Sequence, residues 1–239
     1  VGGPQSHRGR SYRAISWSVV SWPEIPGYVR AASRGYAVTD RLTRIKLCGM
    51  TRSEDVQLAV ALQVDFIGLI FAARSPRRVT LAQAADLRVL VPPSTRVVAL
   101  LMNNARDDID AIIARAQPDL LQFHGDEAAE FCASFGLPYF KAIAMGDAAD
   151  PLPAMAAFPS ASGFVLDGHG AGEQGGSGKR FDWSRLPRDQ RIPILLAGGL
   201  NADNVALALR TAQPWGVDIA SGIEVAPGQK DAAAMRRFV

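Results

Sequence analysis

The sequence repeats one pattern eight times after residue 44: a short apolar, β-branched run followed by an amphipathic segment. This periodicity predicts strands at 44–48, 65–71, 96–102, 119–123, 139–143, 164–167, 192–197 and 217–220. It predicts helices at 53–63, 81–90, 107–116, 127–135, 152–158, 182–186, 202–212 and 230–238. Strands that alternate with helices in this way build parallel sheets that are buried on both faces.

Two architectures use such a repeat, the open doubly wound sheet and the closed (β/α)8 barrel. The count of eight favours the barrel, as do glycine pairs after the seventh and eighth strands, although residues 44–239 lie near the ~200-residue lower limit of that fold. We therefore expect an α/β protein, a single-domain (β/α)8 TIM barrel over 44–239. Three polar residues are expected to cap its helices: Ser53, Thr80 and Asn201.

The first 43 residues have a different composition, rich in Ser, Arg, Gly and Pro, and we expect them to be an N-terminal extension that is disordered or a start-site artefact. Residues 1–44 carry seven arginines and two acids, a charge of +5, whereas the whole chain carries +3, which leaves −2 for the rest. The basic character belongs to the extension, so it gives no support for a nucleic-acid partner.

Composition narrows the class of protein further. The chain is 48% hydrophobic and 21% charged, which is typical of a globular protein with a sizeable core. No apolar run approaches the ~18 residues of a membrane span, so no membrane partner is expected. The two cysteines, Cys48 and Cys132, are too few for a disulfide scaffold and predict a reducing, cytoplasmic location.

Two reactive groups fall at strand ends, where parallel α/β proteins keep their chemistry. Cys48 ends the first strand and precedes Gly49, and Asp167 ends the sixth. A thiol and a carboxyl group placed there can act as a base and an acid on one substrate. Cys48 could instead be a small core residue, as Cys132 on a helix is expected to be, and Asp167 could be a turn cap.

Glycine-rich turns suggest an anion site. Gly198 and Gly199 follow the seventh strand, and Ser221 and Gly222 follow the eighth. Barrels bind phosphate in these loops because glycine lets the backbone N–H groups approach the anion. A further loop, residues 168–178, contains six glycines and is either a lid over the substrate or a disordered insertion. Its GSGK sequence lacks the spacing of a nucleotide phosphate loop.

Two more residues follow strands, Arg77 after the second and His124 after the fourth. A guanidinium at that place could hold a carboxylate through two hydrogen bonds, although it could equally be a surface arginine. A lone histidine is more often structural than a ligand. No paired spacing such as HxxxH or CxxC is present, so we expect no metal.

Seven motifs together carry a family resemblance: KLCGMTRSED, GLIFAARSPRRV, LLQFHGDE, VLDG, GGSGKRFDW, LAGGLNADNV and VDIASGIEVAPGQKD. From about Ile45 to the end, the chain resembles the phosphoribosylanthranilate isomerases of tryptophan biosynthesis. The resemblance implies a TIM barrel and a cofactor-free Amadori rearrangement of N-(5-phosphoribosyl)anthranilate to 1-(2-carboxyphenylamino)-1-deoxyribulose 5-phosphate. It also implies a small phosphosugar as the partner and a monomer or homodimer.

The resemblance assigns roles residue by residue. Cys48 matches the general base that removes the C2′ proton, and Asp167 matches the general acid that protonates the ring oxygen. Arg77 would hold the anthranilate carboxylate, and Asp218 would contact or orient the substrate. We place His124 among the substrate-binding residues too. The residues matching the phosphate site are Gly178, Gly198, Gly199, Ser221 and Gly222.

Three other functions remain open on the residues alone. The related isomerase of histidine biosynthesis uses aspartates as both acid and base, and Cys48 argues against it. A non-catalytic phosphosugar-binding barrel would keep the glycine turns without needing Cys48 and Asp167 together. A Schiff-base aldolase could use Lys141 on the fifth strand, although a strand lysine is more often structural.

Overall fold

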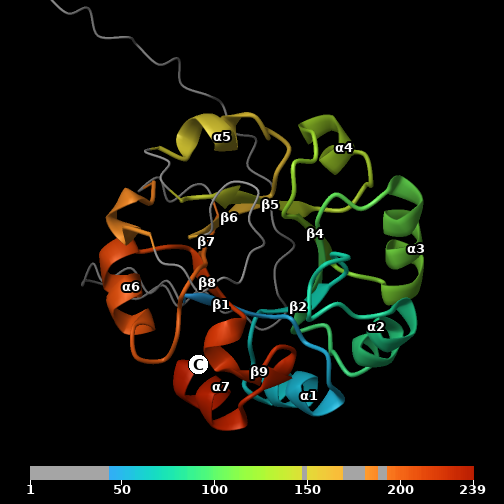
Figure 1. Ribbon diagram of the computed structural model, residues 1–239, viewed down its shortest axis with the longest axis horizontal. Helices are drawn as coiled ribbons and strands as arrows, with labels where there is room; N and C mark the ends of the chain where they lie inside the picture. The colour runs from blue at the N-terminus through green and yellow to red at the C-terminus, as the bar shows by residue number, and fades with distance from the viewer. Residues whose placement is uncertain (1–42, 147–149, 169–180, 188–192) are drawn as a thin grey trace, which may run out of the picture.

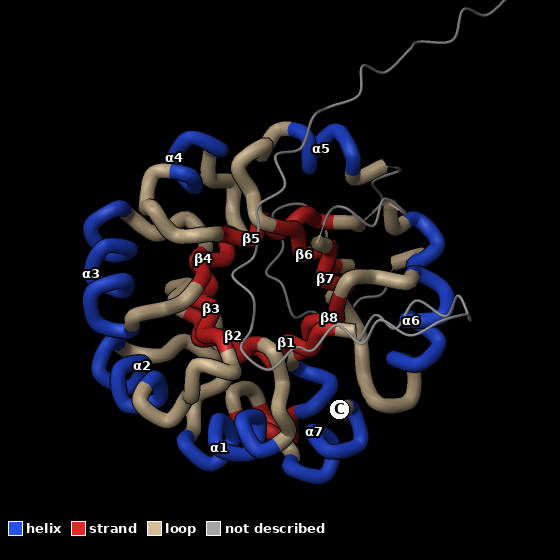
Figure 2. The backbone as a smooth tube through the Cα atoms, turned by 180° about the vertical axis from the view of Figure 1, so that it is seen from behind, coloured by secondary structure: helices blue, strands red, loops and turns tan. Residues whose placement is uncertain are grey.

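The computed structural model describes residues 43–146, 150–168, 181–187 and 193–239. Eight parallel strands form a closed barrel in chain order, with helices around the outside (Figures 1 and 2). The strands are β1 Arg44–Cys48, β2 Phe66–Ile70, β3 Arg96–Leu101, β4 Leu120–Phe123, β5 Tyr139–Ala144, β6 Gly163–Asp167, β7 Ile194–Leu196 and β8 Gly216–Ile219. The expected (β/α)8 barrel is therefore confirmed.

Pairing between the first and last strands closes the ring and excludes the open doubly wound sheet. β1 pairs with β8 in parallel, from Arg44 opposite Gly216 to Leu47 opposite Ile219. Gly216 makes this contact possible, because a Cβ there would lie 2.6 Å from the carbonyl oxygen of Arg44. The two ends of the described chain thus meet in one sheet.

The outer ring contains seven α-helices among the described residues. They are α1 Ser53–Ala61, α2 Leu81–Arg88, α3 Arg106–Ala116, α4 Ala129–Ala133, α5 Leu152–Ala156, α6 Val205–Ala212 and α7 Ala232–Phe238. The described residues also form two short 3₁₀ turns, η1 Trp183–Arg185 and η2 Ser221–Ile223. No helix within these described ranges is long and apolar enough to cross a membrane.

The core has two layers because strand side chains alternate between the faces of the sheet. Phe66, Val98, Leu120 and Phe140 fill the barrel interior. A larger cluster joins the outer face of the strands to the helices and includes Leu47, Ile67, Val97 and Leu121. At one end of the interior a small cluster, built on Cys48, Ile70 and Leu100, forms the floor of an open mouth.

The helix caps were predicted in part. Thr80 caps α2 through a full capping box with Gln83, as expected. Ser53 does not cap α1, because it is the first helical residue, and Arg52 precedes it with no side-chain cap. Asn201 accepts from the backbone N–H groups of Asp203 and Asn204, but it caps a turn, since α6 begins at Val205.

One element was missed. Residues between the last predicted strand and the last predicted helix form a two-stranded hairpin, β9 Glu224–Ala226 and β10 Gln229–Lys230, with Gly228 at a φ of +80°. Lys230, which was expected to begin the last helix, instead ends this hairpin. Asp231 then caps α7 by accepting from the N–H groups of Ala233 and Ala234. In Figure 1, β9 lies outside the strand ring, beside α1 and α7.

Candidate active site

A cavity of about 300 Å³ opens at the carboxyl ends of the strands. Nine of the residues predicted for the site line it together: Cys48, Arg77, His124, Asp167, Gly198, Gly199, Asp218, Ser221 and Gly222. The tenth, Gly178, and most of the glycine-rich loop lie outside the described residues. Closure of the barrel brings these residues together, although they are spread over most of the chain.

Cys48 ends β1, and its side chain points into the barrel mouth, where it is 4% exposed. Gly68 lies opposite it on β2. A Cβ at Gly68 would lie 2.6 Å from the Cys48 Sγ, so the glycine supplies the room for the thiol. This placement differs from that of Cys132, which is buried on α4 outside the barrel.

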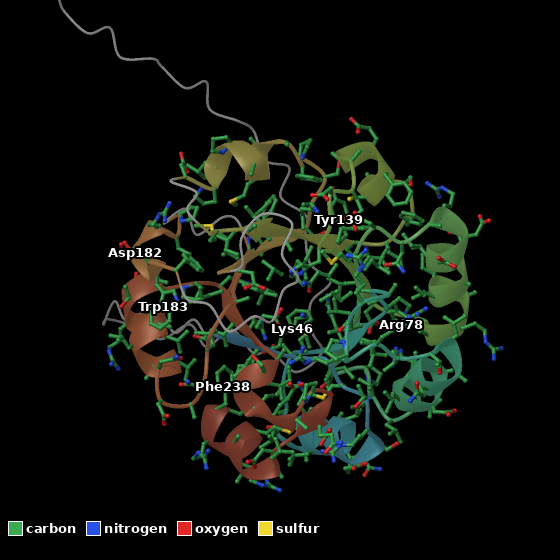
Figure 3. All side chains as sticks on the ribbon, in the orientation of Figure 1. Lys46, Arg78, Tyr139, Asp182, Trp183 and Phe238 are labelled. Carbon is green, nitrogen blue, oxygen red and sulfur yellow. The ribbon has the colours of Figure 1, made fainter. Side chains whose placement is uncertain are left out.

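A buried ion pair lies beside the thiol. Lys46 is two residues before Cys48 on β1 and fully buried, and its Nζ donates to Asp218 Oδ2 on β8 at 2.7 Å. Figure 3 labels Lys46 near the middle of the barrel. The other oxygen of Asp218, Oδ1, is buried and accepts no hydrogen bond from the described residues. It remains available to a ligand in the cavity, which Asp218 also lines.

The pair influences the ionisation of Cys48. Burial raises the pKa of the thiol, and the positive charge of Lys46 opposes this by favouring the thiolate. Burial likewise raises the pKa of Asp218, against the influence of Lys46. For Lys46 itself, burial is outweighed by Asp218 and Cys48, so its pKa is raised and it stays charged. Lys46 is a functional candidate that was not predicted from the sequence.

Asp167 ends β6 and lies three strands from β1 around the closed ring. Its Oδ2 is 3.8 Å from the Nε2 of His124, which follows β4. The Nδ1 of His124 is 3.2 Å from the Nε2 of Gln122 on β4. His124 therefore lies between the side chain of Gln122 and the carboxylate of Asp167.

Arg77 follows β2 and lines the cavity, and Glu224 of β9 holds it. Arg77 Nε donates to Glu224 Oε1 at 2.9 Å, and Nη2 donates to Oε2 at 2.7 Å. Glu224 also accepts from the Nζ of Lys230 at 2.8 Å. Arg77 was predicted from the sequence, whereas Glu224 and Lys230 were not, although both lie in the motif VDIASGIEVAPGQKD.

Glycines shape the turns after β7 and β8. Gly198 and Gly199 have φ values of +86° and +62°, a region in which other residues are unfavourable. A Cβ at Gly222 would lie 2.0 Å from the carbonyl oxygen of Leu200. The two turns therefore pack together with their backbones exposed to the cavity, as an anion site requires.

Lys141 has a structural environment that does not suit Schiff-base chemistry. Its Nζ lies 3.1 Å from Glu127 Oε2 and donates to the carbonyl oxygen of Gly125, and its side chain is buried outside the cavity lining. Cys132 also lies on that side, and burial raises its pKa to about 11. Within the described ranges, no group of three His, Cys, Asp or Glu side chains could hold a metal.

Comparison with known families gives one match that spans most of the chain. Residues 45–239 match the family described as "N-(5'phosphoribosyl)anthranilate (PRA) isomerase". A relative from Xanthomonas campestris pv. campestris (strain 8004), named N-(5'-phosphoribosyl)anthranilate isomerase, is 50% identical over 203 residues. That alignment covers 82% of this chain and 91% of the relative.

Solved structures agree with this match. The phosphoribosyl anthranilate isomerase of Thermotoga maritima is 32% identical with a TM-score of 0.73, covering 82% of this chain and 97% of its own. A second structure of such an isomerase is a complex with reduced 1-(o-carboxyphenylamino)-1-deoxyribulose 5-phosphate. It is 28% identical with a TM-score of 0.70, and the match covers 82% of this chain and 96% of the other.

Proposed function

This chain belongs to the N-(5'-phosphoribosyl)anthranilate isomerase family, and we propose that Cys48 and Asp167 are the base and acid of its reaction. It catalyses the Amadori rearrangement of N-(5-phosphoribosyl)anthranilate to 1-(2-carboxyphenylamino)-1-deoxyribulose 5-phosphate in tryptophan biosynthesis. The observation that carries the assignment of roles is the meeting of Cys48, Asp167 and the glycine turns in one cavity.

The reaction needs one proton delivered and one removed. Asp167 donates a proton to the ring oxygen as the bond from C1′ to that oxygen breaks, which leaves an open-chain iminium. The Cys48 thiolate then removes the proton from C2′, and the electron pair of that C–H bond forms the C1′=C2′ bond of an enol amine. Transfer of a proton to C1′ and loss of the proton of the C2′ hydroxyl give the ketone. No electrons leave the substrate, so acid and base groups suffice.

The barrel interior prepares the base. A thiol buried beside Ile70 and Leu100 is mostly neutral, since burial raises its pKa. The Lys46 ammonium lies next to it and stabilises the thiolate that the reaction requires. Asp218 holds Lys46 through Oδ2, and its free Oδ1 is placed to accept a hydrogen bond from a sugar hydroxyl.

The two ends of the substrate have matching groups in the cavity. The turns at Gly198, Gly199, Ser221 and Gly222 are suited to the phosphate because backbone N–H groups can surround an anion there. Arg77, at the mouth near Cys48, is suited to the anthranilate carboxylate. This arrangement would place C2′ beside Cys48 and the ring oxygen toward Asp167.

Particular residues argue against each of the three alternative functions. Cys48 occupies the position at which the histidine-pathway isomerase has an aspartate. Lys141, the residue an aldolase would need, is bound to Glu127 outside the cavity. A non-catalytic barrel would not need the buried ion pair of Lys46 and Asp218 beside the Cys48 thiol.

Turnover of N-(5-phosphoribosyl)anthranilate, generated in situ and followed by the loss of its fluorescence, tests the proposal. We expect wild-type turnover, and we expect Cys48→Ser and Asp167→Asn each to lower kcat by roughly 10² to 10⁴, the usual contribution of a general acid or base. Both variants should still bind the reduced product, because neither residue belongs to the phosphate turns. Full turnover by either variant would refute its role.

We also propose a cytoplasmic location and a monomeric or homodimeric state. Both cysteines are free thiols, which fits a reducing compartment. The substrate is a small phosphosugar, and the excess of basic residues is confined to residues 1–44, so the charge of the chain provides no argument for a nucleic-acid partner.

A further inference from the structure

Glu224 lies on the hairpin outside the barrel ring, yet it joins Arg77, which lines the cavity, to Lys230 of β10. It accepts from Arg77, from the Nζ of Lys230 and from the backbone N–H of Gly228 at 3.2 Å. Its side chain is only 4% exposed. The charges of Arg77 and Lys230, with hydrogen bonds from both, hold the pKa of Glu224 below its ordinary value against the effect of burial. Glu224 is therefore ionised at neutral pH.

The way in which Glu224 binds Arg77 leaves part of the guanidinium free. Glu224 contacts Nε at 2.9 and 3.0 Å and Nη2 at 2.7 Å, and these two atoms form the side edge of the group. A guanidinium has five N–H donors, and no described residue accepts from Nη1. The end edge, Nη1 with Nη2, can still bind a second carboxylate through two hydrogen bonds.

The stem of Arg77 is held as well. A Cβ at Gly49 would lie 2.7 Å from the Cδ of Arg77, and Gly49 has a φ of +75°. The arginine therefore passes directly over the turn that follows Cys48. Its side chain is 11% exposed. A guanidinium with a packed stem and one bound edge has little freedom left to lose when a ligand binds.

Lys230 limits the charge of the cluster. Its Nζ donates to the carbonyl oxygen of Cys48 at 2.6 Å and to that of Ala220 at 3.2 Å. Burial lowers the pKa of Lys230, and Glu224 opposes this. If a neutral residue replaced Glu224, Lys230 would lose its proton more readily. The net charge of the cluster of Arg77, Glu224 and Lys230 would then rise by less than the loss of the Glu224 charge alone would give.

We infer that Glu224 is a specificity-determining positioning residue, which fixes Arg77 so that its end edge receives the carboxylate of the substrate. The inference rests on the proposed function, because that function supplies the carboxylate. Glu224 itself does not touch the substrate. It removes rotational freedom from Arg77 before binding, and the benefit is confined to ligands that carry the carboxylate.

The experiment measures how strongly the protein distinguishes two stable ligands. The first is reduced 1-(o-carboxyphenylamino)-1-deoxyribulose 5-phosphate, and the second is its counterpart made from aniline, which lacks only the carboxylate. Their dissociation constants are measured by isothermal titration calorimetry for wild type and variants. We expect the carboxylated ligand to bind wild type roughly 100-fold more tightly. We expect Glu224→Gln to lower this ratio roughly tenfold while changing the aniline ligand little.

Three further variants separate positioning from a general loss of structure. Arg77→Met should abolish the preference, and the double variant Arg77→Met with Glu224→Gln should match it, because Glu224 acts through Arg77. Lys230→Met is the matched control. It removes the other cationic partner of Glu224 and leaves the Arg77 bonds, so the ratio should stay at the wild-type value. Thermal melting shows that each variant is folded.

The inference would be overturned by a Glu224→Gln ratio equal to or above that of wild type. Equal weakening of both ligands is one way to obtain the equal ratio. An increase would mean that the negative charge of Glu224 merely opposes the ligand. Failure of the proposed function is recognised separately, because wild type would then not turn over N-(5-phosphoribosyl)anthranilate.

Discussion

Lys46 and Cys48 lie two residues apart on β1 and share the interior face of the barrel. The alternation of the strand makes this unavoidable once Cys48 faces inward. Cys48 could be recognised from the sequence because a thiol before glycine at a strand end is a chemical signal. Lys46, on the same face of the strand, could not, because its partner Asp218 lies 172 residues away and shares no local signal.

The charge of Lys46 leads to a prediction about pH. Burial raises the pKa of Cys48, so kcat/KM should rise with pH as the thiolate forms. Lys46→Met removes the charge with the largest influence on the thiol, the others being Asp218, Lys230 and Arg77. The pKa of Cys48 should then rise further, and the rising limb of the profile should move to higher pH.

The control for this prediction is Lys141→Met, which removes the other buried barrel lysine. Lys141 contacts Glu127 and not Cys48, so its loss should leave the limb in place. Iodoacetamide labelling of Cys48 at a series of pH values, in a Cys132→Ser background, gives the same pKa without turnover. A limb that Lys46→Met does not move would show that the ion pair serves structure alone.

At the level of elements, the strands were predicted better than the helix ends. Long apolar runs such as 65–71 and 96–102 place β2 and β3 to within a residue or two, since both faces are buried. The start of a helix is marked by a single capping hydrogen bond, and the sequence offers several possible capping residues near each predicted start. The hairpin was missed because two strands of three and two residues have too little periodicity to detect.

The caps provide a stability test at this level. Thr80→Ala removes the side-chain acceptor for the N–H of Gln83 and should lower the free energy of unfolding by about 1 kcal/mol. Ser53→Ala is the matched control, because Ser53 makes no cap, and it should change stability little. Urea denaturation of both variants measures the difference. Equal losses would mean that the assignment of the caps is wrong.

At the level of the whole molecule, closure of the barrel follows from the eight strand–helix repeats. The described strands pair all the way round, and the ring begins at Arg44. The eight repeats were enough to predict this arrangement, because a barrel is the compact way to leave no strand edge unpaired. The meeting of the cavity residues followed from the barrel, whereas the interactions of Arg77 with Glu224 and of Lys46 with Asp218 required coordinates.

Deleting residues 1–42 tests whether the barrel is self-sufficient. We expect the shortened chain to melt cooperatively, with a Tm within a few degrees of the full chain, since β1 and every family motif are retained. Circular dichroism of both chains during heating provides the comparison. Loss of the cooperative transition would assign these residues a part in the fold.

The pairing of β1 with β8 also has a consequence during translation. Lys46 on β1 and Asp218 on β8, which are joined by a 2.7 Å hydrogen bond, are separated by 172 residues. At ~5–20 residues per second, a ribosome needs on the order of 10–40 seconds to make that stretch. Throughout this time the free edge of β1 is exposed on the nascent chain, and it could pair wrongly with another polypeptide. This chain therefore stands to benefit from chaperones that cover β1 until β8 emerges.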